Sequence, residues 1–221
     1  MGVMKLPANL ILKQFELGPL QNFLYFLGDE RTKEIAIIDP AWDVPFLIKE
    51  AQREGLKITQ VFLTHGHPDH VNGLGELLKK FDVPVYISKH ELQLFKPACK
   101  NLTEIEKGAV LKVGQISFKT ILTPGHSPGC QCFMYENILI AGDTIFIDGC
   151  GRCDLPGSDP RMMYKSLYET IRKLPDETLI FPGHNYGPAP YDTVGHQKKT
   201  NPYLQSKDIN DFLASRMGMA I

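Results

Sequence analysis

Four apolar segments of this sequence each end at a histidine or an aspartate. They are residues 61–64 before His65, residues 120–123 before His126, residues 138–141 before Asp143 and residues 179–181 before His184. A glycine, alone or after a proline, precedes the last three of these side chains and lets the backbone turn tightly. Because α/β proteins place their sites in loops at one edge of a sheet, we expect the four side chains to meet there.

Strand-like and helical segments alternate in both halves of the chain, which predicts a layered α/β fold. Apolar runs typical of strands cover residues 23–27, 35–38, 58–64, 83–88, 110–113, 116–122, 133–135, 138–141 and 178–181. Helical spacing of apolar residues covers residues 46–53, 73–81 and 160–174. No linker or low-complexity tract divides the sequence, so we predict a single domain over residues 1–221.

The composition excludes several classes of partner. With 43% hydrophobic and 22% charged residues and a formal net charge of −1, the 221-residue chain gives no reason to expect a nucleic-acid or membrane surface. Residues 1–13 lack the apolar core and cleavage site of a signal peptide. The sequence has five cysteines, an odd number, and a chain of this length needs no disulfide bonds to be stable. We therefore predict a cytoplasmic protein and derive no oligomeric state.

The densest chemical signal is the run Thr64-His65-Gly66-His67-Pro68-Asp69-His70. Three histidines and a carboxylate within six residues indicate a metal site, because a core histidine normally stands alone. The absence of thiolates from this run argues against a structural zinc site, and the donors suit zinc first and iron second. The candidate histidine and aspartate ligands in the sequence are too many for one tetrahedral ion and fit two adjacent ions better. Two-metal sites activate water for hydrolysis.

These motifs resemble the metallo-β-lactamase fold superfamily. The resemblance rests on the run above, on Thr123-Pro124-Gly125-His126-Ser127-Pro128-Gly129, on Gly142-Asp143-Thr144 and on Pro182-Gly183-His184, and it extends from Asn22 to Tyr203. It implies a four-layer αβ/βα sandwich with the site at one edge. It also implies that one ion is bound by His65, His67 and His126, that the other is bound by Asp69, His70 and His184, and that Asp143 bridges them.

Two aspartates have a further predicted role in the reaction, and a third has two open interpretations. We place Asp69 and Asp143 among the catalytic residues, since Asp143 holds both ions and can accept a proton from water. Asp39 ends a strand and would orient a ligand histidine, as metal-bound imidazoles usually require. The alternative for Asp39 is a turn or cap residue before Pro40.

Within the superfamily, Gly149-Cys150-Gly151-Arg152 and Tyr186 are similar to the glyoxalase II branch, which hydrolyses the thioester S-lactoylglutathione. The same segments resemble the persulfide dioxygenases, which oxidise glutathione persulfide at one iron. In both groups, residues at the places of Arg152 and Tyr186 contact glutathione. The alternative for Arg152 is an ion pair with Asp148 or Asp154. Glyoxalase II carries a basic residue where Gln205 stands here, so Lys198, Lys199 or Lys207 would have to replace it.

We therefore predict a dinuclear hydrolase of a glutathione thioester. The alternative is a mononuclear iron dioxygenase that uses His65, His126 and Asp143, the two-histidine, one-carboxylate set of such iron sites. A metal sensor without catalysis is a third interpretation, and the full ligand set argues against it. Cys130, Cys132, Cys150 and Cys153 either form a second, thiolate metal site or are small buried side chains, and we favour the latter. His90 and His196 lack ligand neighbours and are expected to be structural or surface residues.

Overall fold

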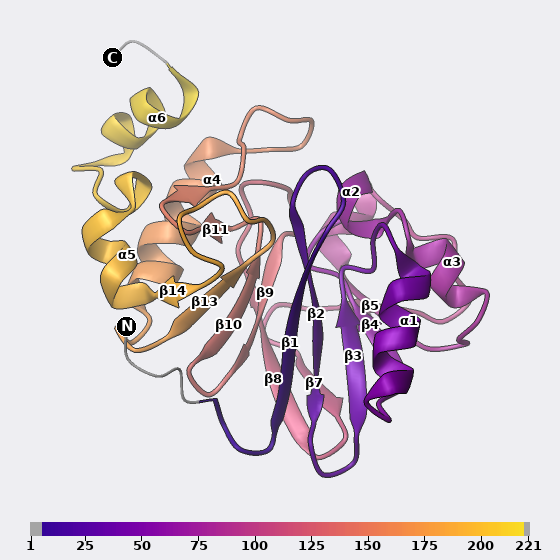
Figure 1. The fold of residues 1–221 in the computed structure, drawn as a ribbon. Helices are drawn as coiled ribbons and strands as arrows, with labels where there is room; N and C mark the ends of the chain where they lie inside the picture. The colour runs from indigo at the N-terminus through magenta and orange to yellow at the C-terminus, as the bar shows by residue number, and fades with distance from the viewer. Residues whose placement is uncertain (1–5, 219–221) are drawn as a thin grey trace.

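The computed structural model describes residues 6–218, which form two six-stranded sheets that face each other (Figure 1). The first sheet contains, in spatial order, β1 (Leu10–Leu17), β2 (Asn22–Asp29), β3 (Glu34–Ile38), β4 (Lys57–Phe62), β5 (Val85–Ser88) and β6 (Leu102–Ile105). Strands β1 to β3 are antiparallel, whereas β3 to β6 run parallel. Parallel neighbours need a crossover. These crossovers contain α1 (Val44–Arg53) between β3 and β4, α2 (Pro68–Val71) and α3 (Leu74–Leu78) between β4 and β5, and the short helix η1 (Lys89–Gln93) between β5 and β6.

The second sheet has the order β14-β13-β10-β9-β8-β7. Its strands are β7 (Val110–Val113), β8 (Ile116–Leu122), β9 (Gln131–Tyr135), β10 (Ile138–Gly142), β13 (Leu179–Pro182) and β14 (Asp192–Thr193). Only β10 and β13 pair in parallel among the described strands of this sheet. The helical segments on its outer side are α4 (Pro160–Lys165), η2 (Ser166–Thr170), η3 (Ile171–Lys173), α5 (Val194–Thr200), η4 (Pro202–Leu204) and α6 (Ile209–Met217). The short pair β11 (Ile145–Phe146) and β12 (Gly149–Cys150) precedes them.

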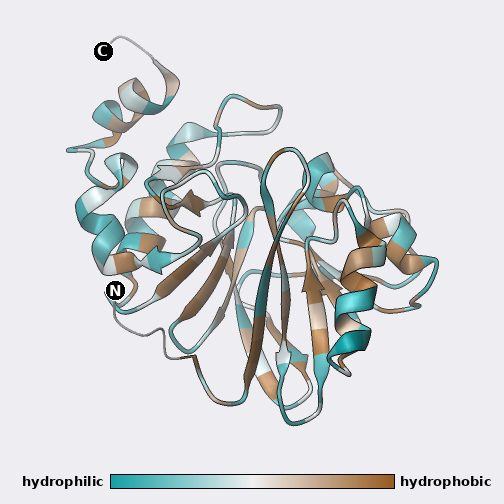
Figure 2. Cartoon of the chain, in the orientation of Figure 1, coloured by the Kyte–Doolittle hydropathy of each residue, from teal (hydrophilic) through white to brown (hydrophobic). Residues whose placement is uncertain are grey.

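Three apolar cores hold four layers together. The central core lies between the sheets and contains Phe62, Phe118 and Phe133. A second core packs α1 and α3 on the first sheet, and a third packs α4 to α6 on the second. The helices accordingly show hydrophilic residues outward and hydrophobic residues toward the strands (Figure 2). The predicted αβ/βα sandwich is confirmed.

Local sequence explains the first of these helices. The Asp43 side chain accepts a hydrogen bond from the Phe46 amide and so caps α1, and a proline occupies the first turn. Gly55 follows the helix with a φ of +66°, a conformation that favours glycine. The predicted end of the helix before Gly55 is thus confirmed, and its apolar face anchors Leu47 and Ala51 in the core.

Most predicted strands are present, and two have the predicted bounds (β7 and β8). The helix predicted over residues 73–81 is shorter and spans only α3, since Pro84 and β5 follow closely. The sequence interpretation missed β1, β6, α5 and α6. The helix predicted over residues 160–174 is present as α4, η2 and η3 in succession.

Within residues 6–218, no helix has the length and apolar character that a membrane span requires. The prediction about a leader concerns residues 1–13, of which residues 1–5 lie outside the described part. The single domain over residues 1–221 and the cytoplasmic location remain predictions.

Candidate metal centre

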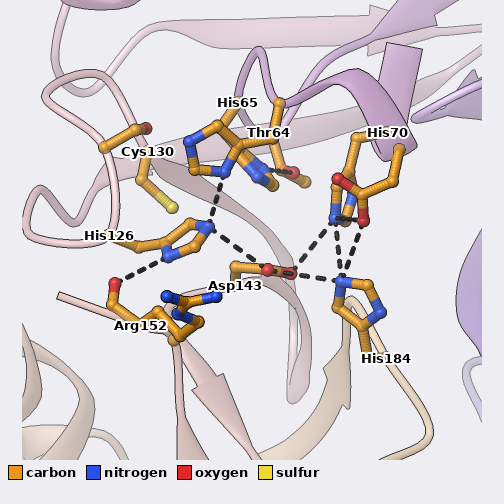
Figure 3. Close-up of polar contacts among 12 residues, drawn as sticks. Thr64, His65, His70, His126, Cys130, Asp143, Arg152 and His184 are labelled. Carbon is orange, nitrogen blue, oxygen red and sulfur yellow. Dashed lines mark hydrogen bonds and ion pairs between the residues drawn. The ribbon is translucent and has the colours of Figure 1, made fainter. Parts of the chain in front are cut away.

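The seven predicted ligands meet at the edge where strands of both sheets end (Figure 3). His65 follows β4 from the first sheet, and Asp143 and His184 follow β10 and β13 from the second. His126 lies in the loop between β8 and β9. The ligands therefore come from both sheets, on opposite sides of the central core. This agrees with the prediction that the side chains after the strand ends meet at one edge.

The first ligand group consists of His65, His67 and His126. Their ligand nitrogens lie within 4.8 Å of one another. His67 Nδ1 is 2.8 Å from His126 Nε2, and the rings of His65 and His126 are 4.9 Å apart. Three nitrogen donors directed at one point match a zinc or iron position.

The second ligand group consists of Asp69, His70 and His184. His70 Nε2 is 3.1 Å from His184 Nε2, and Asp69 Oδ2 lies 3.5 Å and 3.4 Å from these two nitrogens. Asp69 is the most exposed of the three, with 20% of its side chain accessible. This group thus combines two imidazoles with one carboxylate that faces solvent.

Asp143 lies between the two groups. Its Oδ2 is 3.3 Å from His126 Nε2 and 3.3 Å from His184 Nε2, and its Oδ1 is 3.4 Å from His70 Nε2. Gly183 leaves room for this carboxylate, because a Cβ there would lie 2.2 Å from Asp143 Oδ1. One aspartate therefore reaches both groups, which is the geometry of a bridging ligand.

Four of the imidazoles are oriented by a hydrogen bond at Nδ1, the ring nitrogen that faces away from the centre. His126 Nδ1 donates to the Arg152 carbonyl and His184 Nδ1 to the Leu20 carbonyl, each at 2.8 Å. His70 Nδ1 donates to Asp39 Oδ2 at 3.0 Å, and His65 Nδ1 is 3.0 Å from the Thr64 hydroxyl. In the neutral form of each imidazole, this bond leaves an Nε2 lone pair directed at the centre.

Asp39 is the partner of a ligand histidine, as one of its two interpretations predicted. Besides His70, it accepts hydrogen bonds from the Thr64 amide at 2.7 Å and the Thr64 hydroxyl at 2.5 Å. It is 3% exposed and adopts a φ of +51°, an uncommon conformation for a residue with a side chain. Asp39 therefore braces both the segment after β4 that carries His65 and the α2 residue His70.

The donor set fits divalent metal ions. Among the buried side-chain polar atoms of residues 6–218, only His65 Nε2, Asp143 Oδ1 and Thr178 Oγ1 lack a hydrogen-bond partner. Two of these three atoms belong to the predicted ligands, and a buried polar atom without a partner is costly. The closest contacts in the centre join acceptor nitrogens to each other. A cation between them satisfies both observations, and the pattern is typical of the His/Asp dinuclear centre.

The two groups differ in their protonation. Burial, with the neighbouring His70, keeps the pKa of His65 well below its usual value, and burial with His126 lowers the pKa of His67 to about 4. Burial also acts to lower the pKa of His70, but Asp143 and Asp39 outweigh it and raise that pKa to about 9. Burial opposes ionisation of Asp143, yet His70, His184 and His126 hold its pKa well below the usual range.

The proposed substrate residues line a cavity of about 390 Å³ beside the centre. The lining combines ligands with Leu20, Phe146, Arg152, Leu155, Pro156 and Tyr186. Tyr186 stacks on the His184 ring at 4.6 Å and is 54% exposed. Arg152 pairs with Asp154 through two hydrogen bonds of 2.9 Å and 2.8 Å, which is the alternative that the sequence left open. Substrate contact by Arg152 and Tyr186 stays a prediction.

The other predicted side chains contribute no ligand to either group among the described residues. All four cysteines near the motifs are buried, and burial raises their thiol pKa values, that of Cys153 to about 11. Cys130 and Cys132 both contact the Thr144 hydroxyl, and none of the cysteines belongs to a metal-competent group among the described residues. His196 pairs with Asp192, and Lys198 pairs with Asp176. The interpretation of the cysteines as buried small side chains is favoured.

Sequence reasoning missed several residues that support the centre. Asn22 is 1% exposed, donates to Asp69 Oδ2 at 2.9 Å and accepts from the indole nitrogen of Trp42 at 2.9 Å. Glu91 is 1% exposed and contacts the loops of the first group. Neither residue lies in a sequence cluster of histidines and aspartates, so only the tertiary fold shows that they support the centre.

Comparison with known proteins agrees with this geometry. The chain is 30% identical over 195 residues to the probable polyketide biosynthesis zinc-dependent hydrolase BaeB of Bacillus velezensis, covering 88% of this chain and 87% of that protein. It is 30% identical to the human mitochondrial persulfide dioxygenase ETHE1, covering 89% and 77%. The crystal structure of TTHA1623 in a di-iron-bound form is 32% identical, with a TM-score of 0.75 and coverage of 87% and 100%.

A family model spans most of the two sheets. The model, described as the metallo-beta-lactamase superfamily, matches residues 17–184, a range that begins at the end of β1 and closes on the ligand His184. It therefore includes every ligand of both groups as well as Asp39 and Asn22. With its four-layer fold and its His/Asp metal centre, the chain belongs to the metallo-beta-lactamase superfamily.

Proposed function

We propose that the chain is a dinuclear metal-dependent hydrolase of a thioester. The observation that carries this proposal is the presence of two separately braced ligand groups that share Asp143. The second group is held as firmly as the first, since Asn22, Asp39 and the Leu20 carbonyl each fix one of its members. Ligands that are individually oriented in this way favour two working positions.

The chemistry that two divalent ions supply when bound is polarisation of a carbonyl and activation of water at neutral pH. The residues have separate tasks around it. Asp143 stays ionised because of its low pKa and holds the two groups at a fixed separation. Asp69 is the more exposed of the two aspartate ligands that line the cavity, and the low pKa of Asp143 makes that residue the weaker proton acceptor. The Asp69 carboxylate, in place of Asp143, can therefore orient a water molecule and hold the proton that the water loses. Tyr186 and Phe146 cover the His184 side and limit the entry of bulk water.

The proposed substrate is a glutathione thioester such as S-lactoylglutathione. The apolar side chains of Leu20, Phe146 and Leu155 can contact an acyl or thiol chain. Arg152 offers a fork that matches a carboxylate once Asp154 gives way. The name of the Bacillus velezensis relative supports hydrolysis with zinc. We also propose that the protein is cytoplasmic and that it binds neither nucleic acid nor membranes.

A second candidate is a mononuclear iron dioxygenase that acts on glutathione persulfide. The observation that favours it is the similarity to human persulfide dioxygenase over 89% of this chain. His65, His126 and Asp143 meet at one point and would form its two-histidine, one-carboxylate face. This enzyme would not need the other four residues, His67, Asp69, His70 and His184, as ligands.

One paired experiment separates the two candidates. The purified protein is analysed for metal identity and stoichiometry, and then assayed for S-lactoylglutathione hydrolysis and for oxygen uptake with glutathione persulfide. Two zinc or iron ions with thioester turnover are expected. A single iron with oxygen uptake and no hydrolysis would replace the proposal with the second candidate.

The substrate assignment has its own test. Replacing Arg152 by Ala should raise KM for the glutathione thioester by about 10-fold to 100-fold with kcat little changed, because a hydrogen bond to a charged group contributes about 1.5–3 kcal/mol. Asp154→Ala is the matched control, since it frees the guanidinium and should lower KM. If Arg152→Ala leaves KM unchanged, Arg152 does not contact the substrate.

A further inference from the structure

A buried glutamate outside the ligand set joins the two loops that carry the first group. Glu91 lies in η1 (Lys89–Gln93), directly after β5. Its Oε1 accepts a hydrogen bond from the Gly66 amide at 2.9 Å. Its Oε2 accepts from the Ser127 hydroxyl at 2.7 Å and from the Gly129 amide at 2.8 Å.

These partners are adjacent to metal ligands in the sequence. Gly66 separates His65 from His67, and Ser127 follows His126. One carboxylate therefore spans the loop after β4 and the loop between β8 and β9. The ligands in those loops form the His65, His67 and His126 group. No recorded contact of Glu91 involves Asp69, His70 or His184 within residues 6–218.

The chemistry of Glu91 suits bracing and little else. All three partners are donors, and no cation among residues 6–218 pairs with the carboxylate, whose burial is costly unless its oxygens are hydrogen-bonded. The loop also fits tightly, because a Cβ at Gly129 would lie 2.3 Å from the Glu91 nitrogen. Gln in place of Glu keeps the size and turns one acceptor into a donor that faces a donor.

We propose that Glu91 is a positioning residue for the metal position formed by His65, His67 and His126, and that it does not act on the position formed by Asp69, His70 and His184. This proposal rests on the metal centre of the proposed function but not on its substrate. Metal binding without substrate therefore tests it separately from thioester hydrolysis.

The chain contains a natural reporter for the other position. Trp42 is its single tryptophan, and its indole nitrogen donates to Asn22, which donates to Asp69. Binding of an ion by Asp69, His70 and His184 should therefore change the tryptophan fluorescence. Binding by the His65, His67 and His126 group should leave it nearly unchanged.

The experiment titrates Zn²⁺ into metal-free full-length protein in competition with a chromophoric chelator, while tryptophan fluorescence is recorded. In Glu91→Gln, the step without a fluorescence change should weaken between about 10-fold and about 100-fold, as for other residues that orient ligands. The step with the fluorescence change should keep its affinity. Ser127→Ala removes one of the three hydrogen bonds and should shift the same step by a smaller factor.

A control separates positioning from a general loosening of η1. Ser88→Ala removes the side-chain cap of the same segment, and within residues 6–218 the Ser88 side chain makes no hydrogen bond to the ligand loops. It should leave both steps unchanged. The proposal is overturned if Glu91→Gln leaves the affinity of the step without a fluorescence change unaltered, or if it weakens both steps equally. It is also overturned if Ser88→Ala weakens that step as much as Glu91→Gln does. If Glu91→Gln does not fold, Ser127→Ala decides the question. The proposal is then overturned if Ser127→Ala leaves the affinity of the step without a fluorescence change unaltered.

Discussion

The two halves of the metal centre have different chemistry. The half with His65, His67 and His126 uses three imidazoles, and the pKa values of His65 and His67 are depressed by burial. The half with Asp69, His70 and His184 contains a carboxylate, and its two histidines have raised pKa values because Asp143 is near. The first half is thus ready to bind a cation at neutral pH, whereas His70 of the second half must lose a proton first.

This difference bears directly on function. The dioxygenase candidate needs only His65, His126 and Asp143, so the second half would be unused. The hydrolase needs both halves, and the hydrogen bonds from Asn22 to Asp69 and from His70 to Asp39 are explained if the second half binds an ion. Variants that act on one half at a time can therefore test whether both halves bind an ion.

The largest effect is expected where the halves join. Asp143→Asn removes a charge that both groups share, so kcat for hydrolysis should fall on the order of 10³-fold or more, because Lewis-acid activation contributes several kcal/mol. Steady-state kinetics with metal analysis checks this. Asp148→Asn, which changes a nearby loop residue outside the ligand set, is the control. Retention of two ions with normal kcat would mean that Asp143 does not bridge.

Metal removal should reveal the halves as two steps. An ion that binds only the folded protein stabilises it by about 2.7 kcal/mol when the free ion is at 100 times its Kd. Thermal unfolding at increasing chelator concentration should therefore show two decreases in Tm, one for each half. A single decrease with one equivalent of metal released would show that only one half binds an ion.

Asn22→Ala should weaken the second half alone. Its amide orients Asp69, so the loss should lower the affinity of one Zn²⁺ equivalent by about 10-fold and leave the other unchanged. Competition with a chromophoric chelator measures both affinities. The control is Asn72→Ala, which frees the Trp42 amide without touching Asp69. Equal weakening of both equivalents would contradict the division into halves.

The smallest effect is a difference in pH dependence. In the metal-free protein the pKa of His70 is about 9, so at pH 7 this histidine carries a proton that a metal ion must displace. The affinity of the second half should therefore rise with pH by at most about 10-fold per unit and level off near pH 9. The first half should change little above pH 7, because the pKa of His67 is about 4. Equal proton release in both steps, measured calorimetrically in two buffers, would remove the distinction.

Much of this centre can be predicted from sequence because its signals are local. Strands β7 and β8 alternate buried and exposed residues with a period of two, and their bounds are predicted correctly. The ligands stand at strand ends next to glycines, so density and position identify them together.

The missed elements lack such signals. β1 contains Lys13, Gln14 and Glu16 and is only partly buried, so its apolar start does not extend into a recognisable strand. α5 and α6 are short and bury few residues. The contacts of Glu91 and Asn22 join residues that are 20 to 47 positions apart in the sequence. The pairing of Arg152 with Asp154 is one of two alternatives that the sequence leaves open.

The most direct test follows activity as the centre fills. Zn²⁺ is added stepwise to metal-free protein, and S-lactoylglutathione hydrolysis is measured at each step together with bound metal. A centre with two working halves predicts little turnover at one equivalent and full turnover at two, with tryptophan fluorescence changing as the second half fills. Full turnover at one equivalent, with no further change at two, would contradict the dinuclear hydrolase.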